Sequence, residues 1–203
     1  MRGAGVQVSA GQANILLLLT VQSGCTMVET YALRPCVGVV FMIRLEPFCD
    51  RYTEALLPFI ADFWDVHHAE FSSETCCGIL RDWTKGDGRF FVIVRDETAV
   101  GFLRTHNSSP TVCWIDDIYV DALQRGQGIA SAAIRQLEKS LLADGCRSFC
   151  MEVAPDNLPA MRLYHRLGYD RLSLITMRKD YDDFETERVE HIAGLPMRIR
   201  HLG

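Results

Sequence analysis

The sequence predicts a mixed α/β domain, because short apolar runs typical of strands alternate with amphipathic stretches typical of helices. The chain has 203 residues, of which 48% are hydrophobic and 23% charged, so it is long enough to bury one core. It contains no internal repeat and no low-complexity linker that would divide it into two folding units. We therefore expect one domain in which helices flank a central sheet.

Strands and helices can be placed from the period of the apolar residues. Strands are expected at residues 42–47, 90–94, 99–103, 112–120, 149–154 and 173–178. Helices are expected at residues 49–67, 72–85, 130–144 and 160–167. The second and third strands flank a short polar turn and form a hairpin, and another turn is expected at 107–110. Pro58 indicates a kink or a late start in the first helix.

The most informative segment is a glycine loop between the expected strand 112–120 and the following helix. Its residues are Gln124, Arg125, Gly126, Gln127, Gly128, Ile129 and Ala130. A chain that passes through glycines into a helix directs free backbone N–H groups, and the positive end of the helix dipole, at one point. Glycines let a phosphate approach the backbone closely. The loop therefore indicates an anion site, although a tight connection without a ligand would use the same residues.

Two common phosphate-binding loops do not fit this segment. The dinucleotide fingerprint needs a third glycine, and the chain has Ser131 and then Ala132 there, with no acidic residue at the ribose spacing. A nucleoside-triphosphate loop needs Gly-Lys-Ser or Gly-Lys-Thr, and neither occurs.

Composition argues against several classes of partner. A formal charge of -5 and a pI near 5.7 give no basic footprint, so nucleic-acid binding is not expected. The eight cysteines lack paired metal-ligand spacing, so no metal site is expected, and we interpret them as reduced side chains of a cytoplasmic protein. The apolar run at 15–19 is too short to cross a bilayer, so no membrane association is expected.

The first 41 residues differ from the rest because they carry almost no charge. We expect 1–41 to be an extension outside the functional domain, which would begin at Met42. A secretory signal is the alternative, with Arg2 as its basic region and Cys25 at a cleavage or lipidation site. The domain is expected to span 42–181, followed by a tail at 182–203.

Four motifs occur in a fixed order in the second half of the chain. They are Asp116-Asp117-Ile118-Tyr119-Val120, Arg125-Gly126-Gln127-Gly128-Ile129-Ala130, Asn157 and Leu163-Tyr164-His165-Arg166-Leu167-Gly168-Tyr169. Together they resemble the GNAT superfamily of N-acetyltransferases, whose R-x-x-G-x-A cofactor signature is met by Arg125, Gly128 and Ala130. The resemblance covers residues 42–181. It implies a mostly antiparallel sheet of about six to seven strands, about four flanking helices and a splayed strand pair at the cofactor site.

The resemblance implies acetyl-CoA as co-substrate. Strand backbone would pair with its pantetheine arm at Ile118, Tyr119 and Val120. Loop amides would bind its pyrophosphate at Arg125, Gly126, Gln127, Gly128, Ile129 and Ala130. Asn157 would hydrogen-bond the pantetheine arm. Its place before a helix equally predicts an N-cap, and both roles are compatible.

Acyl transfer to an amine needs a neutral nitrogen, although an alkyl ammonium has an ordinary pKa of about 10.4. Asp116 and Asp117 are the candidates to assist its deprotonation. Neighbouring strand residues face opposite sides, so we expect only one to face the site and favour Asp116. Either could instead cap a turn or pair with a surface arginine. The resemblance implies that Tyr164 protonates the thiolate, although a core aromatic also fits its position.

The predicted function is an N-acetyltransferase acting on a small cationic amine, because the acidic pair resembles that of polyamine-type and other small-amine acetyltransferases. A non-catalytic acyl-CoA-binding module, or a transferase that uses another acyl-CoA or a protein amine, is the alternative. Trp64, His67 and His68 are candidates for acceptor contact. Dimers are common among similar proteins, so a homodimer is one expectation for the assembly.

Overall fold

The computed structural model describes residues 16–18, 30–33, 41–65, 71–86, 88–177, 179, 181 and 186–200. The strands are β1 (Leu16–Leu18), β2 (Thr30–Leu33), β3 (Phe41–Pro47), β4 (Arg89–Arg95), β5 (Thr98–Ser109), β6 (Val112–Val120), β7 (Ser148–Met151), β8 (Thr186–Ile192) and β9 (Leu195–Arg200). The helices are α1 (Thr53–Asp65), α2 (Ser73–Lys85), α3 (Ile129–Ala143) and α4 (Leu158–Leu167), with 3-10 turns η1 (Asp50–Tyr52) and η2 (Ala122–Gln124).

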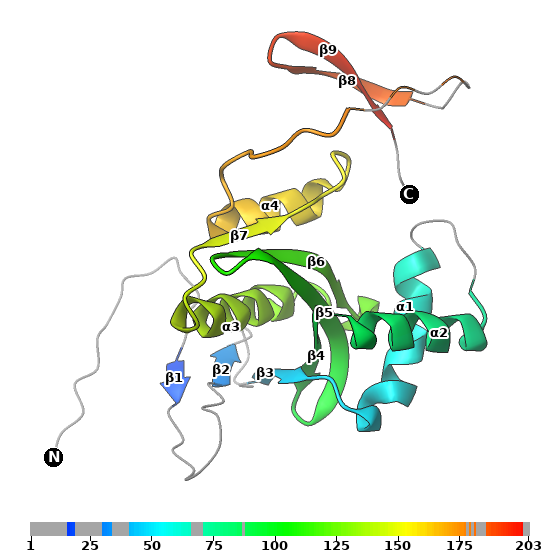
Figure 1. Ribbon diagram of the computed structural model, residues 1–203, viewed down its shortest axis with the longest axis vertical. Helices are drawn as coiled ribbons and strands as arrows, with labels where there is room; N and C mark the ends of the chain where they lie inside the picture. Colours follow the sequence, from blue (N-terminus) through cyan, green and yellow to red (C-terminus); the bar gives the residue numbers. More distant parts are fainter. Residues whose placement is uncertain are drawn as a thin grey trace, which may run out of the picture.

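One sheet organises the molecule (Figure 1). Its strands follow the chain in the order β1-β2-β3-β4-β5-β6-β7, and each neighbouring pair is antiparallel except β6 and β7, which are parallel. The mostly antiparallel sheet with four helices confirms the predicted fold class. β8 and β9 form a separate two-stranded hairpin.

Helices cover both faces of the sheet, and each face has its own apolar core. The α1-side core packs under α1 and α2 and includes Leu56, Ile60, Leu80, Val92, Phe102 and Tyr119. The α3-side core packs under α3 and includes Ile43, Ile93, Leu103, Ile115, Ile134 and Leu137. Both sets are almost fully buried. Because strand side chains alternate between faces, neighbours such as Phe102 and Leu103 enter different cores.

Local signals explain most helix boundaries. Ser72 caps α2 by accepting a hydrogen bond from the backbone N–H of Thr75 at 3.2 Å. Gly168 ends α4 with a φ of 100°, a conformation that favours glycine. Pro58 lies inside α1, which begins five residues earlier at Thr53, so the alternative of a late helix start is wrong.

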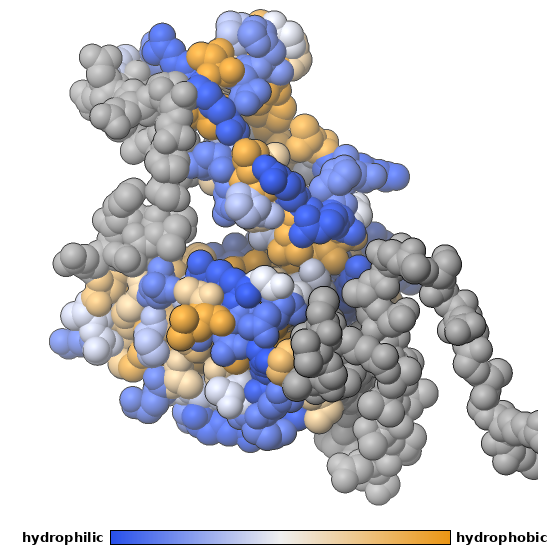
Figure 2. Space-filling model, turned by 180° about the vertical axis from the view of Figure 1, so that it is seen from behind, coloured by the Kyte–Doolittle hydropathy of each residue, from blue (hydrophilic) through white to orange (hydrophobic). Residues whose placement is uncertain are grey.

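The expected end of one strand and the expected presence of another are wrong. β5 continues to Ser109, through residues expected to form a turn, because it pairs with β6 as far as Val112. The strand expected at 173–178 is absent over its described part, 173–177. Leu174 is 71% exposed and Met177 72% exposed, and a strand without a pairing edge is not stable. The chain after α4 runs through the upper part of the molecule (Figure 1), where Figure 2 shows apolar surface. Arg178 lies outside the described residues.

Two short strands come from the region expected to be an extension. β1 pairs with β2, and β2 pairs with β3 at the edge of the sheet. In the described residues no helix is long and apolar enough to span a membrane.

Candidate active site

The glycine loop connects β6 to α3 through η2. Gly126 and Gly128 have φ angles of 77° and 79°, in the left-handed region that favours glycine. Gly128 is the N-cap of α3, and no side chain caps this helix end. Both glycines are exposed. The first amides of α3 therefore point outward from a helix N-terminus, as an anion site requires.

An arginine from a distant strand holds this loop. Nη1 of Arg95, in β4, donates hydrogen bonds to Oε1 of Gln124 at 2.5 Å and to Oε1 of Gln127 at 2.7 Å. Its guanidinium carbon also lies 3.2 Å from the centre of the Phe41 ring. Arg95 carries no signal of this role in the sequence, because only the register of β4 brings it to the loop.

Arg125 lies back against β6. Its Nε donates a hydrogen bond of 2.9 Å to the carbonyl oxygen of Val120, and its Nη2 lies 3.9 Å from Oδ2 of Asp62 in α1. Its guanidinium carbon is 5.5 Å from the centre of the Tyr119 ring. The positive charge thus sits at the base of the loop, between the loop and α1.

β6 and β7 separate where the cofactor arm was expected. They pair over four residues, from Val112↔Ser148 to Ile115↔Met151, and β6 then continues alone to Val120. The other edge of Ile118, Tyr119 and Val120 pairs with β5. Their edge toward β7 therefore has no strand partner among the described residues. β6 and β7 therefore form the splayed strand pair that was predicted for the cofactor site.

A β-bulge in β6 changes the expectation for the two aspartates. Arg104 pairs with Asp117 and Thr105 pairs with Ile115, so Asp116 is an extra residue in β6. Alternation is interrupted there, so the two aspartates do not lie on opposite faces, as they would in a regular strand. Both carboxylates reach β5 side chains two residues apart, which share a face of the sheet.

Each of these carboxylates has a partner on β5. Oδ2 of Asp117 accepts a hydrogen bond of 2.6 Å from Nε of Arg104, whose guanidinium also lies 4.9 Å from the centre of the Trp83 ring in α2. Oδ1 of Asp116 lies 2.6 Å from Nδ1 of His106. The pairing of Asp117 with an arginine is the structural alternative that the sequence left open. The contact with Trp83 places this face on the side of α1 and α2.

A third carboxylate on this side was missed in the sequence. The hydroxyl of Tyr119 donates a close hydrogen bond to Oδ2 of Asp62. Burial, followed by this bond, raises the pKa of Tyr119 well above its ordinary value. Asp62 itself is about half exposed. Trp64 packs at the edge of the α1-side core, and His67 and His68 lie outside the described residues.

Asn157 is the N-cap residue of α4 and Tyr164 lies within this helix, on the far side of the splay from α1 (Figure 1). Asn157 caps the helix by accepting a hydrogen bond of 3.2 Å from the backbone N–H of Ala160. Tyr164 is half-buried against the α3-side core, with its ring centre 6.3 Å from that of Tyr169. Burial raises the pKa of Tyr164, so its hydroxyl keeps its proton at neutral pH.

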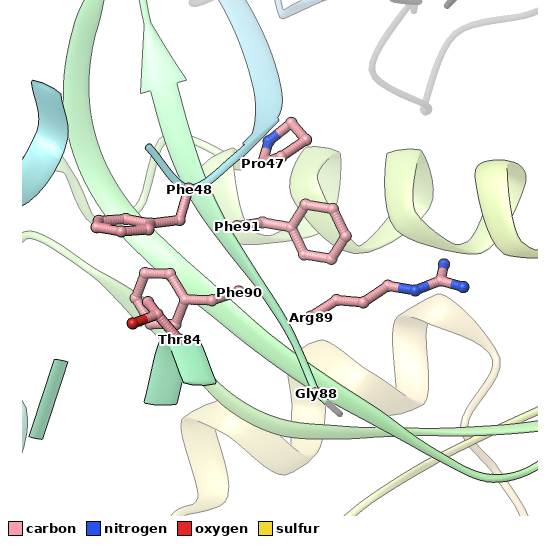
Figure 3. A pocket seen from close by; sticks show the side chains of 7 residues that line it. All are labelled: Pro47, Phe48, Thr84, Gly88, Arg89, Phe90 and Phe91. Carbon is pink, nitrogen blue, oxygen red and sulfur yellow. The ribbon is translucent and has the colours of Figure 1, made fainter. Parts of the chain in front are cut away.

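A hollow in the surface lies away from these residues. It has a volume of about 310 Å³ and is lined by Pro47, Phe48, Thr84, Gly88, Arg89, Phe90 and Phe91 (Figure 3). Arg89 is its one charged lining side chain, and its Nη1 lies 3.7 Å from Oδ2 of Asp144. The hollow contains none of the predicted site residues, so we place the candidate site at the loop and the splay. Among the described residues no cluster of three or more His, Cys, Asp or Glu side chains is able to hold a metal ion.

Comparisons with known proteins identify the family of the chain. The model of the acetyltransferase (GNAT) family matches residues 53–169, which is more than half of the chain. The aminoglycoside N-acetyltransferase AAC(6')-Iy in complex with CoA is similar in structure, with 16% identity and a TM-score of 0.57 over 72% of this chain and 99% of that one. The same enzyme with the bisubstrate analogue CoA-S-monomethyl-acetylneamine gives 18% identity and a TM-score of 0.55, over 68% and 98%.

A possible acetyltransferase from Clostridium difficile 630 gives 15% identity and a TM-score of 0.55, over 73% of this chain and 99% of that one. At these identities the structural likeness shows a shared fold, whereas the family model covers both the glycine loop and the Tyr164 motif. The chain therefore belongs to the GNAT family of acetyltransferases, whose acyl donor is acetyl-CoA.

Proposed function

We propose that the chain transfers acetyl from acetyl-CoA to a primary amine of a small cationic acceptor, by direct attack of the amine on the thioester. The observation that carries this proposal is the geometry of the glycine loop. Two positive-φ glycines and an uncapped helix N-terminus present bare amides beside an open strand edge. That arrangement fits a cofactor with a pyrophosphate at one end and an amide-containing arm at the other.

Named residues fit each part of this cofactor. Amides from Gly126, Gln127, Gly128, Ile129 and Ala130 would hold the pyrophosphate, whereas the N–H of Arg125 donates a hydrogen bond of 3.4 Å to the carbonyl oxygen of Ala122. The open edge of Ile118, Tyr119 and Val120 would pair with the pantetheine arm. Asn157 already accepts the Ala160 N–H through its side-chain oxygen, and its amide nitrogen has no hydrogen-bond partner among the described residues, so it would donate to the arm. Acetyl-CoA supplies the activated acyl group.

Tyr164 would supply the proton for the departing thiolate. Its half-buried position on α4 and its raised pKa keep the hydroxyl protonated, as a general acid requires. Asp116 and Asp117 would act from the opposite face of the sheet, where they assist deprotonation of the amine. Acid and base would therefore approach the thioester from different sides.

The charges on the α1 side favour a cationic acceptor. Asp62, Asp116 and Asp117 place three carboxylates on this side, whereas Arg104 offsets one of them. Arg125 offsets the negative charge of a second carboxylate, that of Asp62, and a bound pyrophosphate would neutralise this arginine. A net negative charge on this side attracts an ammonium group and disfavours an anionic acceptor. The name of AAC(6')-Iy states that it acts on aminoglycosides, which are small polyamino molecules.

A panel of amines tests this proposal with the purified full chain. Polyamines, aminoglycosides, amino acids and a lysine peptide are each incubated with acetyl-CoA, and free CoA is measured together with the mass of the acetylated product. We expect the highest kcat/KM for a small acceptor with two or more amines.

Calorimetric titration with acetyl-CoA alone is run beside this panel. Binding without any turnover would leave only the non-catalytic module and contradict the proposal. A preference for the lysine peptide, or for succinyl-CoA or propionyl-CoA over acetyl-CoA, would contradict its choice of acceptor or donor.

A further inference from the structure

We propose that His106 is the catalytic base that takes the proton from the acceptor amine, with Asp116 as its positioning residue. This inference rests on the proposed function and goes beyond it, because it replaces direct action of the aspartates with a histidine that the motifs do not contain. The observation behind it is the 2.6 Å contact between Nδ1 of His106 and Oδ1 of Asp116.

The contact determines which ring nitrogen is able to accept a proton. An ionised carboxylate only accepts hydrogen bonds, so the Nδ1 of His106 must carry a hydrogen and donate it. In the neutral imidazole the lone pair then lies on Nε2. In the part of the chain that the structure describes, Nε2 makes no hydrogen bond that would use this lone pair. The carboxylate also stabilises the imidazolium that forms after proton uptake.

A second contact holds the ring in place. The ring of His106 stacks on that of Trp114, its partner in the β5–β6 register, with ring centres 6.4 Å apart and an angle of 7° between the planes. The side chain of His106 remains 47% exposed, whereas Asp116 is only 21% exposed. A base needs this combination, because the ring is oriented by partly buried partners while its free nitrogen stays open to an acceptor and to water.

The position along β6 matches the expected reach of the cofactor. Asp116 is the first residue after the last β6–β7 pair, at the point where the splay opens. It lies four residues before Val120, which is about 13 Å at the rise of a strand. An arm that starts at the loop and follows β6 from Val120 therefore reaches the splay point near Asp116. His106 stands beside that point on the α1 side, whereas Tyr164 belongs to α4 on the α3 side.

The neighbouring acids are less suited to this task. The carboxylate of Asp117 accepts a hydrogen bond of 2.6 Å from Nε of Arg104, so this oxygen is already engaged by a cation. The carboxylate of Asp62 accepts the hydroxyl of Tyr119 and lies 3.9 Å from Nη2 of Arg125. Both can attract an ammonium group. Among the titratable side chains on this face, His106 combines an oriented ring with an uncommitted lone pair.

The proton balance of the reaction is complete with these groups. Nε2 of His106 takes one proton from the acceptor ammonium, and the freed nitrogen lone pair forms a bond to the acetyl carbonyl carbon. The carbon–sulfur bond breaks with its electron pair on sulfur, and sulfur takes the proton of the Tyr164 hydroxyl. The second nitrogen proton returns to Tyr164 through water, and His106 releases its proton to solvent. The net products are the amide, CoA and one proton.

Two variants of His106 test this role in the full chain with acetyl-CoA and the best amine of the panel. His106→Asn keeps a donor toward Asp116 but has no basic nitrogen, so we expect kcat to fall by about 10² to 10⁴ while the Kd for acetyl-CoA stays within about twofold. His106→Gly leaves a space for added imidazole, and we expect imidazole to restore activity to this variant and not to His106→Asn. His191→Asn, at an exposed histidine of β8, is the matched control and should keep native kcat.

Each result bears on a separate claim. If native protein acetylates an amine and His106→Asn does so at a similar rate, His106 is not the base and the proposed function survives. Loss of activity in His106→Gly without rescue by imidazole would also overturn the role of His106. If native protein acetylates no amine at all, the proposed function fails, and the inference fails with it. Asp116→Asn should lower kcat, and added imidazole should restore little of this kcat. Asp116→Glu should retain part of the native kcat.

Discussion

The hydroxyl of Tyr169 donates a hydrogen bond of 2.6 Å to Oε1 of Glu138, and this bond ties the segment after α4 to α3. The side chain of Glu138 is partly buried, and burial raises the pKa of its carboxyl group despite the bond. The contact matters for function because α3 carries the glycine loop and α4 carries Tyr164. It fixes two parts of the candidate site relative to each other.

Removal of this hydroxyl should destabilise the fold. Tyr169→Phe leaves a partly buried carboxyl group without its donor, which costs about 1–3 kcal/mol in the free energy of unfolding. Urea unfolding measured by circular dichroism checks this value. Tyr181→Phe is the control, because Tyr181 is 89% exposed and its change should be within about 0.5 kcal/mol of native. Equal stability of both variants would show that the bond to Glu138 contributes nothing.

The close approach of β5 to β6 requires glycine at position 101. A Cβ atom built there would lie 2.1 Å from the carbonyl oxygen of Tyr119, so the backbone itself would have to move. Gly101→Ala should destabilise the chain by about 1–3 kcal/mol or more and weaken acetyl-CoA binding, since Tyr119 and Val120 form the open edge.

Gly78→Ala in α2 is the matched control for Gly101→Ala. Apart from the backbone of its own helix and its chain neighbours, no atom lies within 4 Å of a Cβ built at Gly78, and alanine favours a helix by about 1 kcal/mol. We expect this variant to be at least as stable as native protein in the same urea titration. A Gly101→Ala variant as stable as Gly78→Ala would contradict the packing of β5 against β6.

Tyr164→Phe tests the proposed general acid. The phenyl ring keeps the packing against the α3-side core but lacks the proton, so kcat should fall by about 10² to 10⁴. The Kd for acetyl-CoA should stay within about twofold of native, as measured by calorimetry. An unchanged kcat, with the rate limited by chemistry in a burst experiment, would remove Tyr164 from this role.

Three buried or half-buried tyrosines should make the chain sensitive to alkali. Burial raises the pKa of Tyr119, Tyr164 and Tyr169 above the ordinary tyrosine value of about 10. The folded chain therefore holds protons that the unfolded chain releases. Their contribution to the free energy of unfolding is complete below about pH 10 and is lost as the pH rises through the folded pKa values.

Urea titrations between about pH 8 and pH 11 measure this loss. Each tyrosine adds a slope of up to about 1.4 kcal/mol per pH unit above its unfolded pKa. Tyr169→Phe should have a shallower slope than native protein. A free energy of unfolding that stays level up to about pH 11 would contradict the burial of these hydroxyls.

Much of the fold could be predicted from the sequence because its elements have strong local signals. The strand at 112–120 was placed at its observed bounds, and Gly168 ends α4 as expected. The strand at 173–178 was predicted wrongly, because apolar residues of β type do not reveal whether a pairing edge is available. The homodimer, the cytoplasmic location and the domain limits remain predictions.

The candidate site was only partly visible in the sequence. The glycine loop is formed by residues that are adjacent in sequence, so the order of strand, glycines and helix is enough to predict its uncapped amides. His106 was missed because the strand was expected to end at Leu103, and a longer β5 would have placed His106 opposite Trp114. The bulge at Asp116 depends on the pairing of β5 with β6, and no property of Asp116 or Asp117 alone indicates it.

Titration of the full chain with CoA, followed by the amide NMR signals of Gly126 and Gly128, tests the central claim most directly. If the start of α3 holds the pyrophosphate, these two signals shift on binding, with a Kd well below the order of 1 mM. Pantetheine, which lacks the pyrophosphate, should leave them in place. Absence of CoA binding at millimolar concentration, or binding that leaves both glycine signals unmoved, would contradict the account.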